Sequence, residues 1–388
     1  MIEVVVPGSK SLTNRALVCA ALARGTSTIT GALVADDTAA MTDCLRALGA
    51  GVAWRGTTVE VEGLAGTVTV SGARLDARLS GTTSRFVLPL LALAHGTNHL
   101  DGAPPLRRRP MGPVLDALRE LGALVVEDGE PGHLPVGVSG PVRAAEVRVR
   151  ADVSSQFVSG LLLAAPAMPS GLRVELDGEL VAAPFVAMTL EVMRQFGASV
   201  EGLAVAPGPY RARTYAIEPD ASAASYFFAA AAITGQEIRV AGLGAPSLQG
   251  DLAFRDVIAR MGHPLRGIDV DLGDMPDMAQ TFAVLAAVAD GPSRVRGVGV
   301  IRGHETDRIA AVVQELRRVG VGAEETDDGF VVEPAPLRPA VVQTYDDHRM
   351  AMAFALLGLV EPGIEIADPE VVAKTFPGFW DALATVRS

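Results

Sequence analysis

Small apolar residues form a recurring helical pattern along the chain of 388 residues. Five copies run from a polar entry to a glycine, at 14–25, 83–96, 224–235, 280–291 and 347–358, and a sixth begins at 154. Residues at the same place in each copy are Arg15, Arg85, Gln156, Tyr226, Phe282 and Arg349. Successive markers are 70, 71, 70, 56 and 67 residues apart. This spacing predicts six copies of a repeat of about 65 residues.

A second, amphipathic helix is predicted after each of the first five patterns. These helices occupy 41–49, 114–122, 188–197, 257–262 and 309–320, and each ends at a glycine. A terminal glycine suits the left-handed cap of a helix. Alternating apolar residues predict strands between the helices, at 68–70, 147–149, 172–174 and 238–240. Each repeat is therefore expected to hold strands and two helices, and six repeats divide into two α/β domains of three.

Hydrophobic residues make up 49% of the chain and the mean hydropathy is +0.31, so a membrane protein has to be considered. The apolar runs at 282–289 and 350–357 are much shorter than the roughly 20 residues that a spanning helix needs. We therefore expect buried core helices and no membrane partner. The first seven residues lack the basic and apolar regions of a signal peptide, which favours the cytoplasm. Cys19 and Cys44 lie in apolar helical patterns, without the spacing of a disulfide framework or a zinc site.

The chain carries 33 basic and 45 acidic residues, a net charge of −12. A sequence pI near 5.0 argues against nucleic acid as a partner, because nucleic-acid-binding domains are usually basic. Only two of the basic residues, Lys10 and Lys374, are lysines. His95 and His99 have the spacing of a metal pair on a helix, but the glycine and threonine between them predict a loop. We expect no metal and no cofactor.

Polar clusters in the first half of the chain lie mostly at the starts of repeat helices. They occupy 7–15, 80–85, 107–110 and 154–156. Backbone N–H groups and the helix dipole favour anions at a helix start, and serine hydroxyls and arginine forks bind phosphates and carboxylates. A run of arginines such as 107–109 is usually a solvated surface. Three hydroxyl-rich helix starts at one phase of the repeat nevertheless favour an anion-binding site.

The second half of the chain adds acids and bases at 277, 302–308, 346–349 and 374–377. Glu305 and Arg308 are three residues apart, so they face the same way in the first turn of a helix. Helix capping alone would explain Thr306 and Asp307. A site rich in arginine and lysine, with two or three carboxylates that can move protons, suits a transfer reaction on a polyanionic substrate.

The same residues carry a resemblance to a known family. The matching motifs are Pro7-Gly8-Ser9-Lys10-Ser11 with Asn14-Arg15, Gly81-Thr82, Arg109-Pro110, Ser154-Ser155-Gln156-Phe157, Asp277, Glu305-Thr306-Asp307-Arg308, Asp347-His348-Arg349-Met350-Ala351-Met352 and Lys374-Thr375-Phe376-Pro377. In their order and type they resemble the 5-enolpyruvylshikimate-3-phosphate (EPSP) synthase family. The resemblance implies two similar domains, each of three βαβαββ repeats in an inside-out α/β barrel, with the active site in the interdomain cleft. The implied domains are residues 9–219 and residues 1–8 plus 220–388.

The resemblance also implies an activity. The family transfers the carboxyvinyl group of phosphoenolpyruvate to the 5-hydroxyl of 3-phosphoshikimate and releases phosphate, by addition and elimination through a tetrahedral intermediate, in the shikimate pathway of aromatic amino acid biosynthesis. The alternative is a carboxyvinyltransferase of specialised metabolism with another hydroxylated anionic acceptor. A UDP-N-acetylglucosamine enolpyruvyl transferase is disfavoured, because that relative uses a loop cysteine, whereas Cys19 and Cys44 lie in predicted core helices. A binding protein without activity is disfavoured, because competent side chains remain at the main positions. The implied partners are small molecules, and we expect a monomer.

Roles are implied residue by residue. The implied phosphoenolpyruvate ligands are Lys10, Gly81, Arg109, Gln156, Arg308, Arg349 and Lys374. The implied 3-phosphoshikimate ligands are Lys10, Ser11, Arg15, Ser154, Ser155, Gln156, Asp277 and His304. The implied catalytic residues are Lys10, Asp277, His304, Glu305 and His348. Among these, Asp277 would help to deprotonate the 5-hydroxyl, and Glu305 would protonate the methylene carbon of phosphoenolpyruvate.

Five positions differ from the residues that the family commonly has. They are Leu79, Ala182, Phe185, Val300 and His304. The missing hydroxyl at Ala182 removes one expected contact to the acceptor's phosphate. These differences bear on the choice of acceptor more than on the phosphoenolpyruvate chemistry, so the alternative acceptor stays open.

Overall fold

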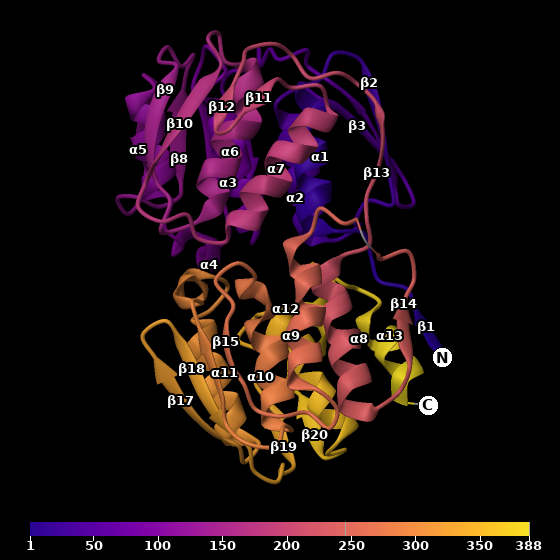
Figure 1. The fold of residues 1–388 in the computed structure, drawn as a ribbon. Coiled ribbons are helices and arrows are strands. Elements are labelled where there is room, and N and C mark those ends of the chain that lie inside the picture. The colour runs from indigo at the N-terminus through magenta and orange to yellow at the C-terminus, as the bar shows by residue number, and fades with distance from the viewer. Residues whose placement is uncertain (245, 388) are drawn as a thin grey trace. The chain divides into compact units, whose positions relative to one another are not determined.

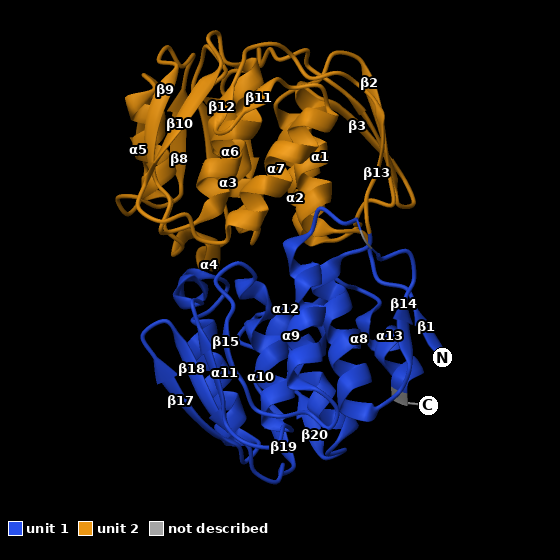
Figure 2. Ribbon diagram, viewed as in Figure 1, with its two compact units in different colours: residues 1–7, 219–388 blue, residues 8–218 orange. Residues whose placement is uncertain are grey.

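The chain folds into two compact units, and the computed structural model describes residues 1–244 and 246–387 of it (Figures 1 and 2). Unit 1 comprises Met1–Pro7 and Pro219–Ser388, and unit 2 comprises Gly8–Glu218. The chain therefore passes between the units twice, and each crossing lies one residue before the boundary expected from the sequence. Backbone hydrogen bonds tie the two crossing segments together, from Asp220 N to Pro7 O in unit 1 and from Ser9 N to Glu218 O in unit 2.

Unit 2 is built on three four-stranded sheets in the part of the chain that the structure describes. The first has the order β13 (Thr214–Ala216), β2 (Thr26–Thr30), β4 (Thr58–Glu62), β3 (Gly51–Arg55). The second has the order β5 (Arg74–Asp76), β6 (Asn98–Asp101), β8 (Val136–Ser139), β7 (Leu124–Glu127). The third has the order β11 (Val200–Glu201), β12 (Ala204–Val205), β10 (Leu172–Asp177), β9 (Glu146–Arg150). Each sheet combines one parallel pair with antiparallel neighbours, as a βαβαββ repeat requires.

Unit 1 also has three sheets among its described residues, but two of them are reduced. The complete one has the order β15 (Asp269–Asp271), β16 (Ser293–Arg296), β18 (Gly329–Glu333), β17 (Gly322–Thr326). The reduced ones are parallel pairs, β1 (Ile2–Val4) with β14 (Ile238–Val240) and β19 (Ala340–Val342) with β20 (Ile364–Ile366). The predicted α/β fold with three repeats in each half is confirmed, and two repeats of unit 1 have lost their antiparallel pair.

Two parallel strand pairs join segments of one unit that are far apart in the sequence. Strand β1 at the N-terminus pairs with β14, in the register Ile2 to Ile238. Strand β13, in the middle of the chain, pairs with β2 near the N-terminus, in the register Thr214 to Thr28. Each unit thus completes its first sheet with a strand that is remote in sequence, which is why the chain has to cross twice.

Buried helices lie inside each unit and the sheets lie outside them (Figure 1). The first helix of each repeat is α1 (Lys10–Leu22), α3 (Gly81–Leu91), α6 (Ser155–Ala164), α8 (Ala221–Thr234), α10 (Ala279–Ala287) or α12 (His348–Phe354). All residues of α3, α10 and α12 are buried. A helix whose residues are mostly apolar on every side has to be buried. The small residues of α10 allow neighbouring helices to pack closely around it.

The second helices confirm the amphipathic prediction. They are α2 (Asp36–Ala47), α5 (Gly112–Glu120), α7 (Ala183–Gln195), α9 (Phe254–Met261) and α11 (Arg308–Arg318). The predicted terminal glycines all have positive φ, between 76° and 102°. The remaining helical segments are α4 (Pro104–Arg107), η1 (Ala165–Ala167), η2 (Gly250–Ala253), η3 (Pro276–Met278), η4 (Gly299–Gly303), η5 (Ala355–Leu359), η6 (Pro369–Lys374) and α13 (Phe379–Arg387).

The predicted strand at 68–70 is wrong, whereas those at 147–149, 172–174 and 238–240 are confirmed. The side chain of Asn98 donates to the carbonyl of Val70 and accepts from the N–H of Ala73, both at 2.9 Å. The side chain of Asn98 thus takes the place of a neighbouring strand at this segment. The alternation of apolar residues cannot distinguish these two kinds of partner.

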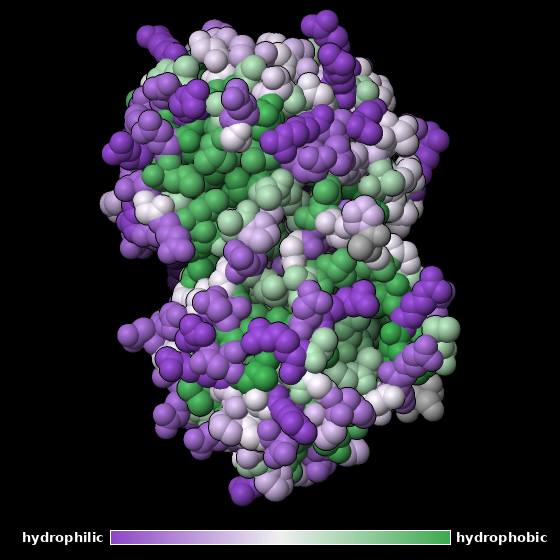
Figure 3. Space-filling view, viewed as in Figure 1, coloured by the Kyte–Doolittle hydropathy of each residue, from purple (hydrophilic) through white to green (hydrophobic). Residues whose placement is uncertain are grey.

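Hydrophilic residues are spread over the visible face of each unit (Figure 3). Within residues 1–244 and 246–387, the structure contains no helix of the length and apolarity that crossing a membrane requires.

Candidate active site

Arg308, the first residue of α11, is the centre of the polar cluster in unit 1. Its side chain is only 1% exposed. The guanidinium donates to both carboxylate oxygens of Asp347, at 2.6 and 3.2 Å. It also donates to Asp277 Oδ1 at 2.9 Å, to Glu305 Oε2 at 2.8 Å and to His304 Nδ1 at 3.1 Å. One cation therefore holds three carboxylates and an imidazole in place.

These contacts use every N–H of Arg308, because a guanidinium has five. Burial alone would lower the pKa of Arg308, but the carboxylates of Asp347, Glu305 and Asp277 outweigh it and raise that pKa. Arg308 is therefore a permanent cation. A substrate oxygen can bind it only by replacing one of the present acceptors, so its implied role as a phosphoenolpyruvate ligand requires a rearrangement at one of these contacts.

His304, which precedes Glu305, faces the same guanidinium. An arginine N–H can only donate, so Nδ1 of His304 accepts and carries no proton in this arrangement. The same nitrogen lies 3.9 Å from Asp277 Oδ1. The structure thus places His304 beside the carboxylate of Asp277 as a neutral ring.

Glu305 lies between two cations. Its Oε2 accepts from Arg308, and its Oε1 accepts from Lys374 Nζ at 2.8 Å. Lys374 is the last residue of η6, and the side chains of Glu305 and Lys374 are 14% and 12% exposed. A carboxylate with a cation on each oxygen and partial access to solvent is placed to exchange a proton with a small anionic ligand.

Asp277 joins Arg308 to Arg349. It belongs to η3, directly before α10, and accepts from Arg349 Nη2 at 2.8 Å. Arg349 is the second residue of α12, whose N-cap is Asp347. Burial would lower the pKa of Arg349, but Asp277 and its neighbours raise it. The remaining implied catalytic residue, His348, is 1% exposed and lies with Nδ1 3.7 Å from Asp347 Oδ1.

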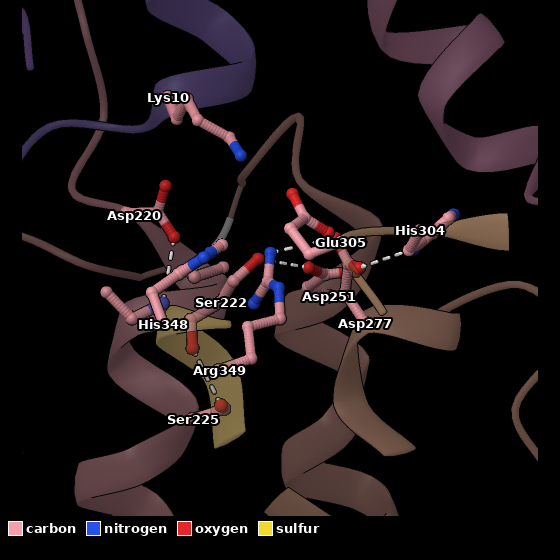
Figure 4. Close-up of polar contacts among 12 residues, drawn as sticks. Lys10, Asp220, Ser222, Ser225, Asp251, Asp277, His304, Glu305, His348 and Arg349 are labelled. Carbon is pink, nitrogen blue, oxygen red and sulfur yellow. Dashed lines mark hydrogen bonds and ion pairs between the residues drawn. The ribbon is translucent and has the colours of Figure 1, made fainter. Parts of the chain in front are cut away.

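Asp251 also belongs to this cluster, although no sequence motif singled it out. It lies in η2, is 4% exposed and accepts a short hydrogen bond from the hydroxyl of Ser222 (Figure 4). Its Oδ1 has no hydrogen-bond partner among the described residues. Burial and the negative charge of Asp277 raise the pKa of Asp251 to about 7, against the pull of Ser222 and Arg349.

We expect the raised pKa of Asp251 to appear in the pH dependence of unfolding. A carboxyl whose folded pKa exceeds its unfolded value near 3.9 stabilises the folded state below that value and loses this contribution as pH rises through 7. Asp251→Asn removes the titration but keeps an oxygen for Ser222. Its unfolding free energy in urea should therefore rise relative to the native protein between pH 5 and pH 8. Asp116→Asn, at an exposed residue of α5, is the control. Parallel pH curves for the native protein and Asp251→Asn would contradict the assignment.

The start of α1 carries the implied ligands Lys10 and Ser11 of unit 2. Ser9 caps the helix, accepting from Leu12 N, so that Lys10 and Ser11 form its first turn. Lys10 Nζ lies 3.3 Å from Oδ2 of Asp37, a residue of α2 that is 3% exposed. Asp37 was not selected from the sequence. An acidic pair in the first turn of an amphipathic helix is usually explained by the helix dipole alone.

Arg15 is buried one turn further along α1. Its Nε donates to Thr189 Oγ1 at 2.7 Å, and its two terminal nitrogens donate to the carbonyls of Ser11 and Phe185 at 2.9 and 3.0 Å. These partners are all neutral oxygens, and burial lowers the pKa of Arg15 to about 9. A buried guanidinium held by neutral groups gains stability from an anionic ligand, as its implied role toward the acceptor's carboxylate requires.

Gly81 and Arg109 meet at the start of α3. A Cβ atom at Gly81 would lie 2.6 Å from Arg109 Nη1, so only glycine allows the guanidinium to pack there. Arg109 is 9% exposed. The two implied phosphoenolpyruvate ligands are therefore brought together by close approach of a side chain to the backbone.

The start of α6 supplies Ser154, Ser155 and Gln156. Ser154 caps the helix and accepts from Gln156 N at 3.3 Å. Arg85 of α3 donates to Gln156 Oε1 at 2.9 Å and lies over the ring of Phe157, 5.1 Å from its centre. Arg85 thus orients Gln156, whereas the sequence had placed Arg85 only in a general anion-binding cluster.

The positions that differ from the family's usual residues also have defined environments. Ala182, in the left-handed region at φ 49°, precedes α7, and its side chain offers no cap to that helix. Phe185 supplies its carbonyl to Arg15. Leu79 is 44% exposed before α3, and Val300 lies in η4. The last of these positions is His304, described above.

The predicted residues thus form two clusters, one in each unit. Unit 1 brings together Asp277, His304, Glu305, Arg308, His348, Arg349 and Lys374. Unit 2 contributes Lys10, Ser11, Arg15, Gly81, Arg109, Ser154, Ser155 and Gln156, at the starts of α1, α3 and α6 and after α4. In both clusters helix starts and arginine side chains provide positive charge, which suits phosphate and carboxylate groups.

Two solved structures share this fold. EPSP synthase from Acinetobacter baumannii superposes with a TM-score of 0.80 at 24% identity, covering 99% of this chain and 95% of that one. The enolpyruvyl transferase NikO from Streptomyces tendae gives a TM-score of 0.77 at 19% identity, covering 100% and 94%. At these identities the likeness concerns the fold alone.

Sequence comparison defines the family. The family model described as EPSP synthase (3-phosphoshikimate 1-carboxyvinyltransferase) matches residues 2–383. The 3-phosphoshikimate 1-carboxyvinyltransferase of Trichormus variabilis is 42% identical, over 97% of this chain and 94% of the relative. That of Thiobacillus denitrificans is 43% identical, over 98% and 96%. The chain belongs to the EPSP synthase family, so the resemblance inferred from its motifs is confirmed.

Proposed function

We propose that the chain transfers the carboxyvinyl group of phosphoenolpyruvate to the 5-hydroxyl of 3-phosphoshikimate, with release of phosphate, in the shikimate pathway of aromatic amino acid biosynthesis. Family membership over nearly the whole chain supports the reaction. The observation that carries the mechanism is the position of Glu305, held between Arg308 and Lys374 and linked through Arg308 to Asp277. This places two carboxylates around one guanidinium, as a reaction with two proton transfers needs.

Substrate binding is assigned to cations of both units. We propose that phosphoenolpyruvate is held through its phosphate and carboxylate by Lys10, Gly81, Arg109, Gln156, Arg308, Arg349 and Lys374. The acceptor is proposed to bind Ser11 and Arg15 through its carboxylate and Ser154 and Ser155 through its phosphate. Since Arg308, Arg349 and Lys374 now bind Asp277 and Glu305, an arriving anion competes with these carboxylates. Substrate binding is therefore expected to loosen the carboxylates that move protons.

The addition step forms the new C–O bond. Once the arriving anion has displaced Glu305 from Arg308 and Lys374, its carboxylate takes a proton from solvent. Glu305 then gives that proton to the methylene carbon of phosphoenolpyruvate, which becomes a methyl group, and positive charge develops at the neighbouring carbon. The 5-hydroxyl of the acceptor attacks that carbon while Asp277 takes the hydroxyl proton. The product is a tetrahedral adduct that still carries the phosphate. The positive charge at this carbon is stabilised by the carboxylates of Asp277 and Glu305, whereas the cations stabilise the substrate's phosphate and carboxylate groups.

The elimination step reverses the first proton transfer. Glu305 takes a proton back from the methyl group, the bond from carbon to the phosphate oxygen breaks, and the methylene double bond returns. Lys10 is proposed to assist the departure of phosphate, since a compact ammonium suits contact with one phosphate oxygen. His304 is proposed to help to position Arg308, which donates to both His304 and Asp277, and His348 is proposed to support Asp347 from its position beside that carboxylate.

Phosphate release from phosphoenolpyruvate tests the proposal. Release should require 3-phosphoshikimate and should be much slower with shikimate, which lacks the phosphate that Ser154 and Ser155 would bind. A nucleoside phosphate as acceptor is the second comparison. Equal or faster release with another anionic alcohol would overturn the assigned acceptor and leave the carboxyvinyl transfer in place.

The alternative acceptor of specialised metabolism is not favoured, because relatives over 40% identical carry the 3-phosphoshikimate name. A mechanism through a loop cysteine is not supported either. Cys19 and Cys44 are buried in α1 and α2, and burial raises the pKa of each thiol to about 12. The proposal also includes a cytoplasmic location and a monomeric state, which cell fractionation and light scattering would test.

A further inference from the structure

The segment that leads into Asp347, His348 and Arg349 contains a strained turn. After β19 the chain reverses at residues 344–347, and Asp347 N donates to Thr344 O at 2.9 Å. The two central residues, Tyr345 and Asp346, have φ values of 56° and 57°. Positive φ at both positions defines a turn that favours glycine, asparagine and aspartate. The left-handed region brings Cβ close to the following carbonyl oxygen, which aspartate tolerates better than most residues, so tyrosine is an unusual choice for such a position.

Glu315 of α11 holds this turn. The hydroxyl of Tyr345 donates to Glu315 Oε1 at 2.6 Å, and Gln343 N donates to Glu315 Oε2 at 3.0 Å. Glu315 is fully buried, and its Oε2 also accepts from Arg318 Nε at 2.8 Å. Burial and the bond to Glu315 raise the pKa of Tyr345 to about 12, so the hydroxyl keeps its proton. A strained backbone persists only where its surroundings determine it, and Glu315 supplies that determination.

The same helix holds both ends of the segment. Arg308 at the start of α11 binds Asp347 through two hydrogen bonds, and Glu315, seven residues later, binds Gln343 and Tyr345. Seven residues are about two helical turns, so both anchors lie on one face of α11. The strained pair lies between the two anchors, directly before the helix start that carries Arg349.

We propose that Glu315 and Tyr345 are positioning residues, which fix the left-handed turn and thereby the place of Arg349 against Asp277. The inference rests on the proposed function, in which Arg349 binds phosphoenolpyruvate. Neither Glu315 nor Tyr345 is assigned to touch a substrate. Their effect on the reaction passes through the backbone of residues 345–347.

Tyr345→Phe tests the inference, because it removes the hydroxyl and retains the ring. Loss of a hydrogen bond to a buried carboxylate should shift the turn enough to lower kcat/KM for phosphoenolpyruvate about tenfold. Most of the change should appear in KM for phosphoenolpyruvate, with little in KM for the acceptor. The matched control is Tyr210→Phe in unit 2, where the buried hydroxyl donates to Leu163 O at 3.0 Å. That control should lower the melting temperature and leave the kinetic constants unchanged.

A rescue separates positioning from general damage. Asp346 is exposed, and Asp346→Gly gives the turn a residue that adopts positive φ without strain. Added to Tyr345→Phe, it should restore kcat/KM to within about threefold of the native value. Failure of the rescue, or a Tyr345→Phe enzyme with native constants, would overturn the proposal. If the native protein itself releases no phosphate, the proposed function fails instead. Phosphoenolpyruvate affinity by calorimetry in the same proteins then decides the positioning role.

Discussion

Glu305→Gln should reduce phosphate release by about a thousandfold, since general acid and base catalysis contributes roughly 10²–10⁴. Glutamine has nearly the same shape but can neither give nor take the proton that both half-reactions need. The side chain is 14% exposed and lies at the edge of the cluster, so the fold should be retained. The measurement is single-turnover phosphate release, with phosphoenolpyruvate affinity determined by calorimetry.

Affinity for phosphoenolpyruvate should change little in Glu305→Gln, because the cations assigned to the substrate remain. Glu325→Gln is the matched control, since Glu325 of β17 is an exposed carboxylate that also pairs with an arginine, Arg302, at 2.8 Å. It should retain native turnover. A Glu305→Gln enzyme that turns over within tenfold of the native rate would remove Glu305 from the proton transfers.

Arg308→Met should cause the largest loss of stability of any single change considered. It leaves Asp347, which is fully buried, without the guanidinium that binds both of its oxygens. Removing one partner of a buried ion pair costs about 3–5 kcal/mol, because the other charge stays buried and uncompensated. Urea unfolding measures this loss. Arg296→Met, at an exposed pair with Asp269, should leave the unfolding free energy nearly unchanged.

A second substitution distinguishes the stability lost through the uncompensated charge of Asp347 from the stability lost through poorer packing. Asp347→Asn, combined with Arg308→Met, removes the stranded charge and should recover part of the stability, which a double-mutant cycle quantifies. Equal losses in Arg308→Met and Arg296→Met, or no coupling between residues 308 and 347, would show that Arg308 is not the centre of the cluster.

The repeat pattern predicted much of the fold because it reflects burial. Helices such as α10 and α12 are buried along their whole length and packed within a unit, so small residues recur at each repeat. Glycines that end the second helices adopt positive φ, which few other residues do easily. These two signals are local, and they located the helices within a few residues. Periodicity could not reveal that β1 pairs with β14 and β13 with β2, since strand partners far apart in sequence leave no local trace.

Sequence analysis predicted the residues of the candidate site that lie in recognisable motifs, and it missed residues outside them. Asp277, Glu305, Arg308 and Lys374 meet as the motifs suggested. Asp251 was missed because it lies in a short helical segment whose partner, Ser222, belongs to another helix. Its importance comes from burial next to Asp277, which only the folded chain creates. Asp37 was missed for a different reason, because helix-dipole stabilisation explains its position without any ligand.

The role of Arg308 is the clearest refinement of the sequence interpretation. Spacing indicated that Arg308 and Glu305 share a helix face, and the resemblance implied a substrate ligand. In the structure all five N–H groups of Arg308 are engaged by Asp347, Asp277, Glu305 and His304. The residue therefore organises the carboxylates before any substrate binds, and its contribution to binding depends on exchange at these contacts.

Deuterium transfer from solvent tests the central claim, that Glu305 adds and removes a proton at one carbon, most directly. With phosphoenolpyruvate and 3-phosphoshikimate in D₂O, the transient methyl group gains one deuterium, and elimination keeps deuterium in part of the product. Deuterium is expected in the methylene group of the enolpyruvyl product, detected by mass spectrometry, and almost none with Glu305→Gln. Product that forms at the normal rate without deuterium in that group would contradict addition and elimination through Glu305.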